Sequence, residues 1–439
     1  MNQLRRVVKL LPFAVTVSYI GRIGHKVYED GRIEANNFPE IRSGRTAYAV
    51  ERVVFDYGIT LYSTSYDSPE EYEKEKRKAH VRSAQRMLKL CEQNGGCFIK
   101  VGQHIATLKN LLPEEYVNEF KVLHSNAPKM DMEDIRAVIR EEFGADPDEI
   151  FDDFNEEPLG TASLAQVHKA KLKKTGEEVA VKVQHRCVQQ HFDGDIHTMH
   201  FLVRVVNWVF PKFEFMWLAE EMEKNLPLEL DFREEGKNAE KVSKMYANYD
   251  WLKVPKIYWE FTSKRILVME YCSGSHITDK EYIEQNGIDK TLLSKRVGEM
   301  YGDMTFRHGF LHCDPHPGNI LVRKNMDGKD EIVLLDHGLY KQLTDEFRLQ
   351  NAHLFNSILK GDQEAIQNNA EKLGVGQHWQ LLACMLTERS WDSIQKGIDK
   401  SEKNEAEVCF SLPHCLILIY PFFFWTDYRG QRVCCKIHE

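Results

Sequence analysis

The clearest alternation of apolar and polar residues lies in the middle of the chain. In EEVAVKVQ, residues 177–184, the valines fall on one face of a predicted strand, while Ala180 and Lys182 fall on the other. These valines are Val179, Val181 and Val183. A second strand is predicted for RILVMEY, residues 265–271, because it is an apolar run of strand length. NILVRK and EIVLLD flank Asp327 and Gly328, a dipeptide typical of a hairpin turn.

Helical periodicity surrounds this small sheet on both sides. An amphipathic helix is predicted from Ser83, interrupted at Gly95 and Gly96, and resumed in FIKVGQHIATLKNLL. MEDIRAVIREEFG, at about 131–143, predicts another helix that opens with acidic residues. From about residue 290 to 400 the pattern is helical apart from the hairpin. Helices, a small sheet with a helical insert, and a helical lobe predict an α+β fold.

Composition narrows the class of protein. The chain has 439 residues, 42% hydrophobic residues and a formal net charge of -9. That length accommodates a two-lobed catalytic domain with extensions, and the composition argues against disorder. The acidic balance argues against a nucleic-acid partner, which requires a concentrated basic face. The ten cysteines form neither a CxxC pair nor a regular spacing, so we expect no disulfide framework and no zinc site.

The N-terminal segment has the character of a targeting sequence. MNQLRRVVKLLPFAVTVSYIGRIGHK contains basic and apolar residues and no acidic residue before Glu29. A negative-inside membrane potential draws such segments into mitochondria, so we expect residues 1–28 to be a mitochondrial targeting or apolar segment. A cleaved secretory signal is the alternative, and no A-x-A-like cleavage site follows the apolar run.

Lys182 lies between features typical of nucleotide binding. By itself, a lysine on the outer face of a strand is more often solvated than functional. Upstream, however, EPLGTASLAQVHKA contains small residues whose backbone N–H groups could approach phosphates, and a strand lysine could then pair with phosphate oxygens. A carboxylate must hold such a lysine. The LELDFREEG segment offers four: Glu229, Asp231, Glu234 and Glu235.

HGFLHCDPHPGNILVRKNMDGKDEIVLLDHGLY has the spacing of a kinase catalytic segment. Asp314 is followed five positions later by Asn319, and Asp336 precedes Gly338. In kinases these positions hold an acid that orients the nucleophile and two ligands of Mg²⁺. A metallohydrolase is the alternative, since His312, Asp314 and His316 alternate like metal ligands. We favour phosphoryl transfer because the second acid and Asn319 occur at the kinase intervals.

Five features follow one another in the order found in kinases: the small-residue loop, AVKV, an acidic helix, DxxxxN and DxG. Over roughly residues 40–400, this pattern resembles the aarF-domain or UbiB-type atypical kinases. The more specific marks are KVGQ at Lys100–Gln103, which matches the KxGQ motif, and Glu229-Leu230-Asp231, which matches the ExD motif. The resemblance implies that Lys100 reaches those acids and that Lys100, Gln103, Glu229 and Asp231 are regulatory. It also implies that Glu235 is the partner of Lys182. In a continuous helix Glu229 and Glu235 would point about 240° apart.

The resemblance assigns further residues to ATP binding. These are Gly160, Thr161, Ala162, Ser163, Lys182, Glu270 and Cys272. The family's AAAS loop reads GTAS here, so the preference for a particular nucleotide is less certain. Cys313 replaces the arginine that links a kinase catalytic loop to a phosphorylated segment, which suggests that such control is absent. No APE motif follows Asp336, so we expect no standard platform for a peptide substrate.

We therefore predict an atypical protein-kinase-like two-lobed fold with an N-terminal helical KxGQ extension. The predicted boundaries are 29–150 for the extension, 151–272 for the N-lobe with the ExD insert, 273–405 for the C-lobe and 406–439 for an apolar, cysteine-rich tail. Two prolines interrupt that tail, and its apolar run is too short to span a bilayer. We interpret it as an alternative or misassembled terminus in preference to a segment that dips into a membrane interface.

The predicted function is an ATP-dependent phosphotransferase or ATPase that uses Mg²⁺. Lys182 would hold phosphates, Asn319 and Asp336 would bind Mg²⁺, and Asp314 would orient the nucleophile. The resemblance implies a mitochondrial location near the inner membrane, a role in lipid or coenzyme Q homeostasis, and a lipid or isoprenoid-like small molecule as partner. A nucleotide-binding pseudokinase scaffold without turnover is the alternative.

Overall fold

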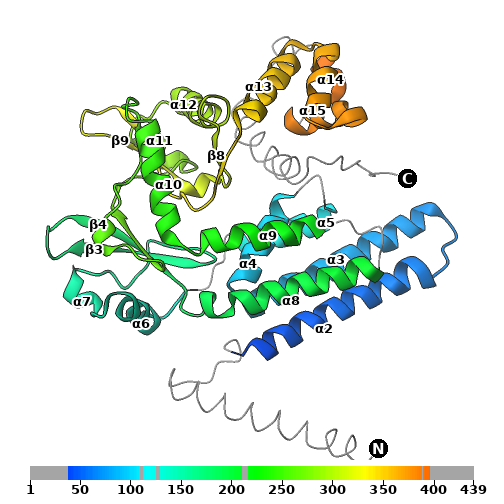
Figure 1. Ribbon diagram of the computed structural model, residues 1–439, viewed down its shortest axis with the longest axis horizontal. Helices are drawn as coiled ribbons and strands as arrows, with labels where there is room; N and C mark the ends of the chain where they lie inside the picture. The colour runs from blue at the N-terminus through cyan, green and yellow to red at the C-terminus, as the bar shows by residue number, and fades with distance from the viewer. Residues whose placement is uncertain (1–37, 109–111, 125–128, 210–215, 388, 396–439) are drawn as a thin grey trace, which may run out of the picture. The chain divides into compact units, whose positions relative to one another are not determined.

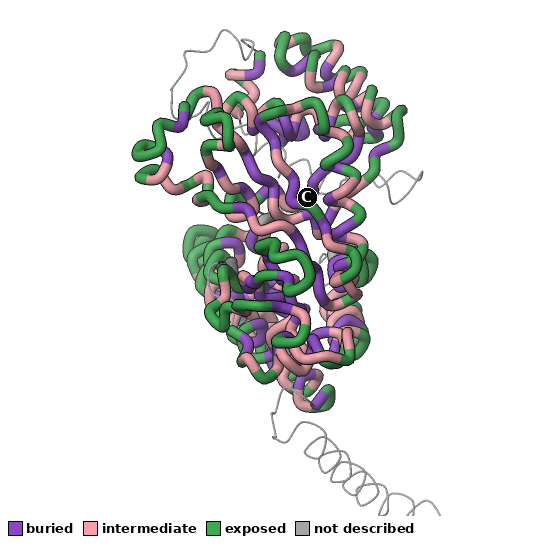
Figure 2. Tube along the Cα trace, turned by 90° about the vertical axis from the view of Figure 1, so that its left-hand side faces the viewer, coloured by how far each residue is buried: buried purple, intermediate pink, exposed green. Residues whose placement is uncertain are grey.

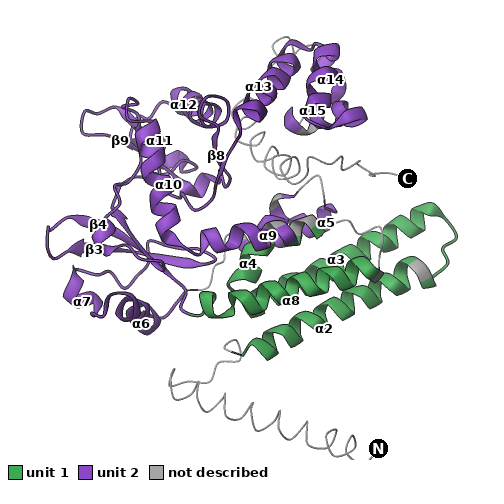
Figure 3. Ribbon diagram, in the orientation of Figure 1, with its two compact units in different colours: residues 1–102, 187–219 green, residues 103–186, 220–439 purple. Residues whose placement is uncertain are grey.

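The computed structural model describes residues 38–108, 112–124, 129–209, 216–387 and 389–395. The predicted targeting segment and the cysteine-rich tail lie outside these residues. The chain forms two compact units, residues 1–102 with 187–219 and residues 103–186 with 220–439 (Figure 3). Among the described helices, none has both the length and the apolar character needed to cross a bilayer.

The first unit is helical and contains the N-terminal half of the predicted extension (Figure 1). Its elements are α2 (Pro39–Tyr57), η2 (Gly58–Ser63), α3 (Pro69–Asn94), the first part of α4 (Cys97–Thr107) and α8 (Val188–Val209). Helix α2 packs against both α3 and α8. The predicted interruption at Gly95 and Gly96 is confirmed, because both glycines end α3 with positive φ angles of 66° and 52°.

Charged side chains join the helices of this unit. The Arg42 guanidinium of α2 donates to both carboxylate oxygens of Asp195 on α8 and to the backbone oxygen of Asn94. Asp56 at the other end of α2 accepts hydrogen bonds from Arg82 and Arg86 of α3. The three helices therefore meet through specific pairs of charges as well as through apolar contact.

The second unit begins with a twisted antiparallel sheet. Its strands are β1 (Phe151–Asp152), β2 (Gly160–Thr161), β3 (Ala165–Leu172), β4 (Glu178–Gln184) and β6 (Ile266–Glu270), in the order β1-β3-β4-β6 with β2 paired to β3. The predicted alternation in β4 is confirmed. Its three valines are fully buried in one apolar cluster with α6 (Met132–Phe143), and Ala180 lies in a different cluster. Figure 2 shows buried residues in purple and exposed residues in green along the chain.

The rest of this unit is mainly helical, with short strands around the catalytic segment. The remaining helical elements are α5 (Glu114–Phe120), η3 (Lys121–His124), α7 (Pro147–Ile150), α9 (Met216–Glu229), α10 (Phe232–Met245), η4 (Trp259–Phe261), α11 (Lys280–Gln285), α12 (Lys290–Gly302), η5 (Asp303–His308), η6 (Pro317–Asn319), α13 (Asp345–Lys360), α14 (Gln363–Lys372), η7 (Gly376–His378), α15 (Trp379–Thr387) and α16 (Trp391–Gln395). The remaining strands are β5 (Leu252–Lys253), β7 (Ser275–His276), β8 (Phe310–His312), β9 (Ile320–Lys324), β10 (Asp330–Leu334) and β11 (Tyr340–Gln342).

Two predictions about local structure have different outcomes. The hairpin is confirmed, since β9 pairs antiparallel with β10 and Gly328 in the turn has φ of 72°. The continuous helix that was the condition for the 240° separation of Glu229 and Glu235 does not form: α9 ends at Glu229, and Asp231 is the N-cap of α10, where its carboxylate accepts from the backbone N–H of Arg233. An aspartate with extended backbone whose carboxylate accepts from a backbone N–H of the first turn favours a helix start over a helix interior.

Candidate active site

The site is centred on Lys182, which β4 places opposite α10. Its Nζ lies 2.6 Å and 2.8 Å from the two carboxylate oxygens of Glu235, so the implied pairing is confirmed. The Glu235 side chain is only 4% exposed, and the Lys182 side chain is 12% exposed. Burial raises the pKa of Glu235 to about 6, although Lys182 opposes the shift. Helix α10 is thereby fastened to the sheet through its first turn.

Asp336 is the second acid near Lys182. Its Oδ2 lies 3.8 Å from the lysine Nζ, and its Oδ1 accepts a hydrogen bond of 2.8 Å from the backbone N–H of Gly338. A Cβ at position 338 would lie 3.2 Å from that oxygen, which explains why glycine suits the tight turn. One lysine thus faces two carboxylates that come from a helix and from the turn after β10.

The catalytic loop is held by its own backbone and by His312. Asn319 at the end of η6 donates from Nδ2 to the backbone oxygen of Asp314 over 3.3 Å, so the two residues of the DxxxxN motif meet. The backbone N–H of Asp314 donates to Nδ1 of His312 over 3.0 Å. Nε2 of His312 lies 3.0 Å from the backbone oxygen of Asp336. His312 therefore connects the loop that carries Asp314 to the turn that carries Asp336.

The same contacts bear on the metallohydrolase alternative. Because Nδ1 of His312 accepts a hydrogen bond, Nε2 must carry the proton and donate to Asp336. Neither nitrogen then has a lone pair for a metal ion. Nδ1 of His316 likewise accepts from the backbone N–H of Gly318. In the part of the chain that the structure describes, no three His, Cys, Asp or Glu side chains are grouped as a metal site.

His337 replaces the phenylalanine of the kinase DFG motif and is locked by polar contacts. The side chain is 1% exposed; Nε2 donates to the backbone oxygen of Leu334, and Nδ1 accepts from the hydroxyl of Tyr340. Burial lowers the pKa of His337 to about 3, so the ring is neutral. Its backbone oxygen accepts from Nδ2 of Asn238 on α10 over 3.0 Å. Helix α10 thus touches the site twice, through Glu235 and through Asn238.

The residues assigned to nucleotide binding occupy two places. Gly160 and Thr161 form β2, and the backbone N–H of Ala162 donates to Ala165, so these small residues make a turn next to β3. Ser163 is buried. Glu270 ends β6, where it pairs with Lys253 over 2.7 Å and accepts from the backbone N–H of Lys256. Cys272, two residues later, is buried.

The KxGQ and ExD motifs meet through a residue that the sequence analysis missed. In the second unit, Nε2 of His104 lies 3.8 Å from Oε1 of Glu229, and both side chains are nearly buried. Gln103 donates to the backbone oxygen of Leu123 over 3.0 Å. His104 follows Lys100 by four residues and so shares its helix face, which is the clue that could have found it. Lys100 belongs to the other unit, and its link to the ExD acids stays a prediction.

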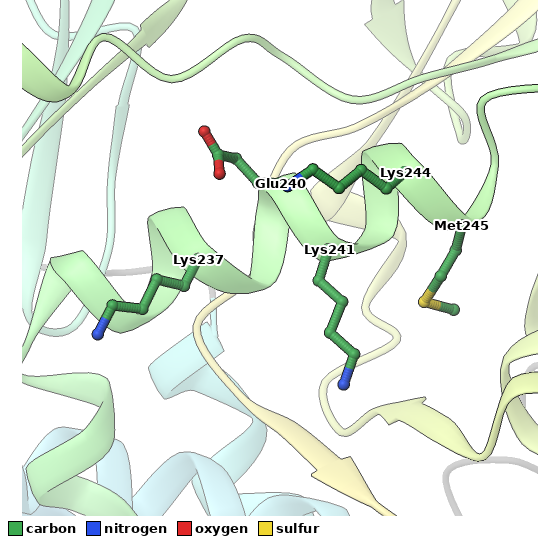
Figure 4. Close-up of a pocket in the computed structure, with 5 residues that line it drawn as sticks. All are labelled: Lys237, Glu240, Lys241, Lys244 and Met245. Atoms are coloured by element: carbon green, nitrogen blue, oxygen red, sulfur yellow. The ribbon is translucent and has the colours of Figure 1, made fainter.

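The outer face of α10 is hollowed by an open pocket of about 450 Å³ that is distinct from the site (Figure 4). All five lining residues belong to this helix: Lys237, Glu240, Lys241, Lys244 and Met245. Lys241 donates to the side chain of Gln342 on β11 over 2.8 Å, and its ammonium lies over the Phe310 ring. The lysines fall roughly opposite Glu235 on the helix. Lys241, which lines this pocket, therefore links α10 to β11.

The donor set fits a nucleotide-bound Mg²⁺. Asp336 offers a carboxylate oxygen, and Asn319 offers its amide oxygen because its nitrogen already donates to Asp314. Hard oxygen ligands of this kind suit Mg²⁺, which usually takes one or two protein groups in addition to substrate phosphates. The arrangement can hold phosphates near Lys182 and a cation near Asp336, with Asp314 close by for an acceptor.

Comparison with known proteins agrees with this geometry. Residues 122–370 match the ABC1 atypical kinase-like domain. AarF domain-containing protein kinase 1 of Gallus gallus is 48% identical over 404 residues, which are 92% of this chain and 76% of that protein. AarF domain-containing kinase 1 of Drosophila melanogaster is 47% identical over 420 residues, which are 94% of this chain and 80% of that protein.

A solved structure extends the comparison to the fold. The Mycobacterium tuberculosis protein Rv3197, in its complex with erythromycin, matches with a TM-score of 0.51 at 20% identity, over 80% of this chain and 97% of that one. The chain belongs to the ABC1 (aarF) family of atypical kinases. The predicted family resemblance and the predicted kinase-like α+β fold are both confirmed.

Proposed function

We propose that the protein is a phosphotransferase or ATPase that binds ATP with Mg²⁺ through Lys182, Asn319 and Asp336. The observation that carries this proposal is the position of the Lys182 ammonium, 2.6 Å from Glu235 and 3.8 Å from Asp336. Of the two carboxylates, Asp336 is the more exposed, so it would hold the cation, while Lys182 would hold phosphate. The family supports kinase-like chemistry but not a particular substrate.

Each side chain has a defined part in that reaction. Lys182, oriented by Glu235, would hold α- and β-phosphate oxygens, while Asp336 and Asn319 would hold the cation. Mg²⁺, when bound, neutralises charge that develops on the transferred phosphoryl group. Asp314 would orient the acceptor hydroxyl or water and take up its proton. His312 would hold the loop that carries Asp314 and the turn that carries Asp336 in a fixed relative position through its two hydrogen bonds.

The experiment is a thermal melt of purified protein with and without ATP and Mg²⁺. We expect the wild type to melt at a higher temperature with both present, and Asp336→Asn to lose the magnesium-dependent part of that shift. Asp327→Asn, in the exposed hairpin turn, is the matched control and should keep it. An unchanged shift in Asp336→Asn would remove the main support for the proposal.

We also propose that the acceptor is not a general protein. Water or a small molecule, including a lipid or isoprenoid-like compound, would suit Asp314, and the absence of an APE motif supports this. ATP turnover measured with and without membrane lipids, and with generic protein substrates, distinguishes these acceptors. Magnesium-dependent nucleotide binding without any turnover would favour the pseudokinase scaffold.

The proposed location is the mitochondrion, close to the inner membrane, in support of lipid or coenzyme Q homeostasis. Its basis is the basic, acid-free N-terminal sequence together with the family resemblance. A fluorescent protein fused to the full chain should enter mitochondria, and deletion of residues 1–28 should leave the fusion in the cytosol. Finding the full-length fusion in the secretory pathway would overturn this proposal.

A further inference from the structure

Tyr301, near the end of α12, buries a hydroxyl that has no hydrogen-bond partner among the described residues. The side chain is 1% exposed, and among the residues that the structure describes no protein group is within hydrogen-bonding geometry of Oη. A phenol hydroxyl removed from water without a partner is unfavourable for folding, and such groups in native structures usually have a functional explanation. Phenylalanine would fill the same space without that unfavourable contribution.

The surroundings of Tyr301 point to the catalytic loop. Its ring packs edge-on against the His312 ring, with centroids 6.2 Å apart and planes at 80°. Nδ1 of His312 accepts the hydrogen bond from the backbone N–H of Asp314. Burial, and next the negative charge of Asp314, raise the pKa of Tyr301, so the hydroxyl keeps its proton and lies within electrostatic reach of that carboxylate. Tyr301 is therefore a protonated donor packed against the loop that carries the acid that would orient the nucleophile.

Tyr246 shows the ordinary way of burying a tyrosine close by. It is 2% exposed, and its hydroxyl donates to the backbone oxygen of Met300 over 2.7 Å. Met300 is the residue immediately before Tyr301 on α12. Tyr301 thus belongs to the turn of α12 that Tyr246 contacts, and the two buried tyrosines differ in whether the hydroxyl forms a hydrogen bond in the described structure.

We propose that Tyr301 is a positioning residue for Asp314. With nucleotide and acceptor bound, the Tyr301 hydroxyl donates a hydrogen bond to the Asp314 carboxylate and fixes the direction in which that carboxylate faces the acceptor. Cys313 stands where kinases have an arginine, so the loop lacks that charged contact, and the neutral Tyr301 hydroxyl supplies a hydrogen bond from α12. This inference rests on the proposed function of Asp314.

A double-mutant cycle with Asp314→Asn tests the inference, with Tyr246→Phe as the matched control. We expect Tyr301→Phe to lower the kcat for ATP turnover about tenfold and to leave the KM for ATP and the magnesium-dependent melting shift unchanged. Its melting temperature without nucleotide should equal or exceed that of the wild type. In the Asp314→Asn background, Tyr301→Phe should have no further effect on residual turnover. Tyr246→Phe should melt earlier and keep its kcat.

Three results would overturn the inference while leaving the proposed function intact. They are a wild-type kcat in Tyr301→Phe, an equal loss of turnover in both backgrounds, and a loss of melting temperature as large as that of Tyr246→Phe. The last would mean that the hydroxyl has a structural partner. A wild-type protein that binds nucleotide and never turns it over would instead contradict the catalytic proposal, and the role of Tyr301 would fail with it.

Discussion

Each of the two units buries an ion pair between residues far apart in the sequence, and the surroundings of the two pairs differ. In the helical unit, Arg42 and Asp195 have side chains that are 4% and 5% exposed, and the guanidinium also donates to the Asn94 backbone. In the kinase-like unit, Lys182 and Glu235 are nearly as buried, but Asp336 lies 3.8 Å from the same ammonium.

The difference separates a structural pair from a functional one. A guanidinium has donors in a fixed plane, and Arg42 uses them on both oxygens of one carboxylate, so the pair is complete. The Lys182 ammonium is a compact charge that lies between two carboxylates. It can therefore give up its contact with one carboxylate and bind a phosphate oxygen in its place. Burial alone therefore does not distinguish the two pairs; the second carboxylate, Asp336, beside the Lys182 ammonium does.

The largest predicted effect is on the structural pair. Arg42→Ala leaves Asp195 buried without its cation, and breaking such a pair costs about 3–5 kcal/mol in free energy of unfolding. Burial already raises the pKa of Asp195, and Arg42 opposes that shift. Hydrogen–deuterium exchange of α2 and α8 should increase strongly. Arg52→Ala, exposed on the same helix, is the control and should change stability by less than about 0.5 kcal/mol. Equal exchange in the two variants would contradict the comparison.

A second, smaller effect concerns Asp56, whose pKa is lowered to about 2, first because Arg82 donates to it and also because Arg86 does. The ordinary value is 3.8, so the ionised carboxylate contributes about 2 kcal/mol to stability. Because the folded-state pKa is depressed, that contribution is complete above about pH 4 and is lost as the pH falls toward 2. Asp56→Asn should remove it at neutral pH. Urea unfolding of the wild type and the variant should therefore converge in acid, and parallel curves at every pH would refute this assignment.

The third effect concerns Lys182 and, like the effect of Asp56, disappears as the pH falls, although at a higher pH. Glu235 has a pKa of about 6, so at pH 7 it can take up a proton for about 1.4 kcal/mol when its cation is removed. Lys182→Met should therefore destabilise the protein by at most about that amount at pH 7 and by almost nothing below pH 6, where Glu235 is already protonated.

Nucleotide binding separates this variant from the structural one. Lys182→Met should lose the ATP-dependent melting shift at every pH, while folded Arg42→Ala should keep it. A Lys182→Met variant that is as unstable at pH 5 as at pH 8 would show that Lys182 has a structural role like that of Arg42.

The smallest effect concerns Asn238. Asn238→Ala removes the hydrogen bond to the backbone oxygen of His337, which should cost about 1 kcal/mol and weaken the magnesium-dependent melting shift, because the turn carrying Asp336 loses its tie to α10. Asn286→Ala, which removes an exposed hydrogen bond to the Tyr282 backbone, is the control and should keep the shift. An identical shift in both variants would show that α10 positions the site through Glu235 alone.

Sequence reasoning succeeded where local pattern and spacing carry the information. The alternation in EEVAVKVQ placed Lys182 on the face away from the buried valines, and the interval between Asp314 and Asn319 predicted that these two residues meet. These features depend on strand periodicity and on loop lengths, both of which can be read from a linear sequence.

The residues that were missed act through contacts between distant segments. His104 meets Glu229, and Asn238 meets the backbone of His337, only because of how helices pack against the loops. Tyr301 looks like an ordinary core aromatic until its unbonded hydroxyl is seen. The break between α9 and α10 was missed because Asp231 reads equally well as a helix residue and as a cap, and tertiary packing decides between them.

The polar lock on His337 has a consequence for inhibitor chemistry. In protein kinases the packing of the DFG phenylalanine distinguishes active from inactive states, and a phenyl ring that is held by apolar contact can be displaced. Here a displaced imidazole would forfeit two ring hydrogen bonds, to Leu334 and Tyr340, and would pull its backbone from Asn238. Compounds that must displace this side chain should therefore bind poorly, while compounds that occupy only the proposed nucleotide site meet no such barrier. Selective ligands for this protein are best sought among the second group.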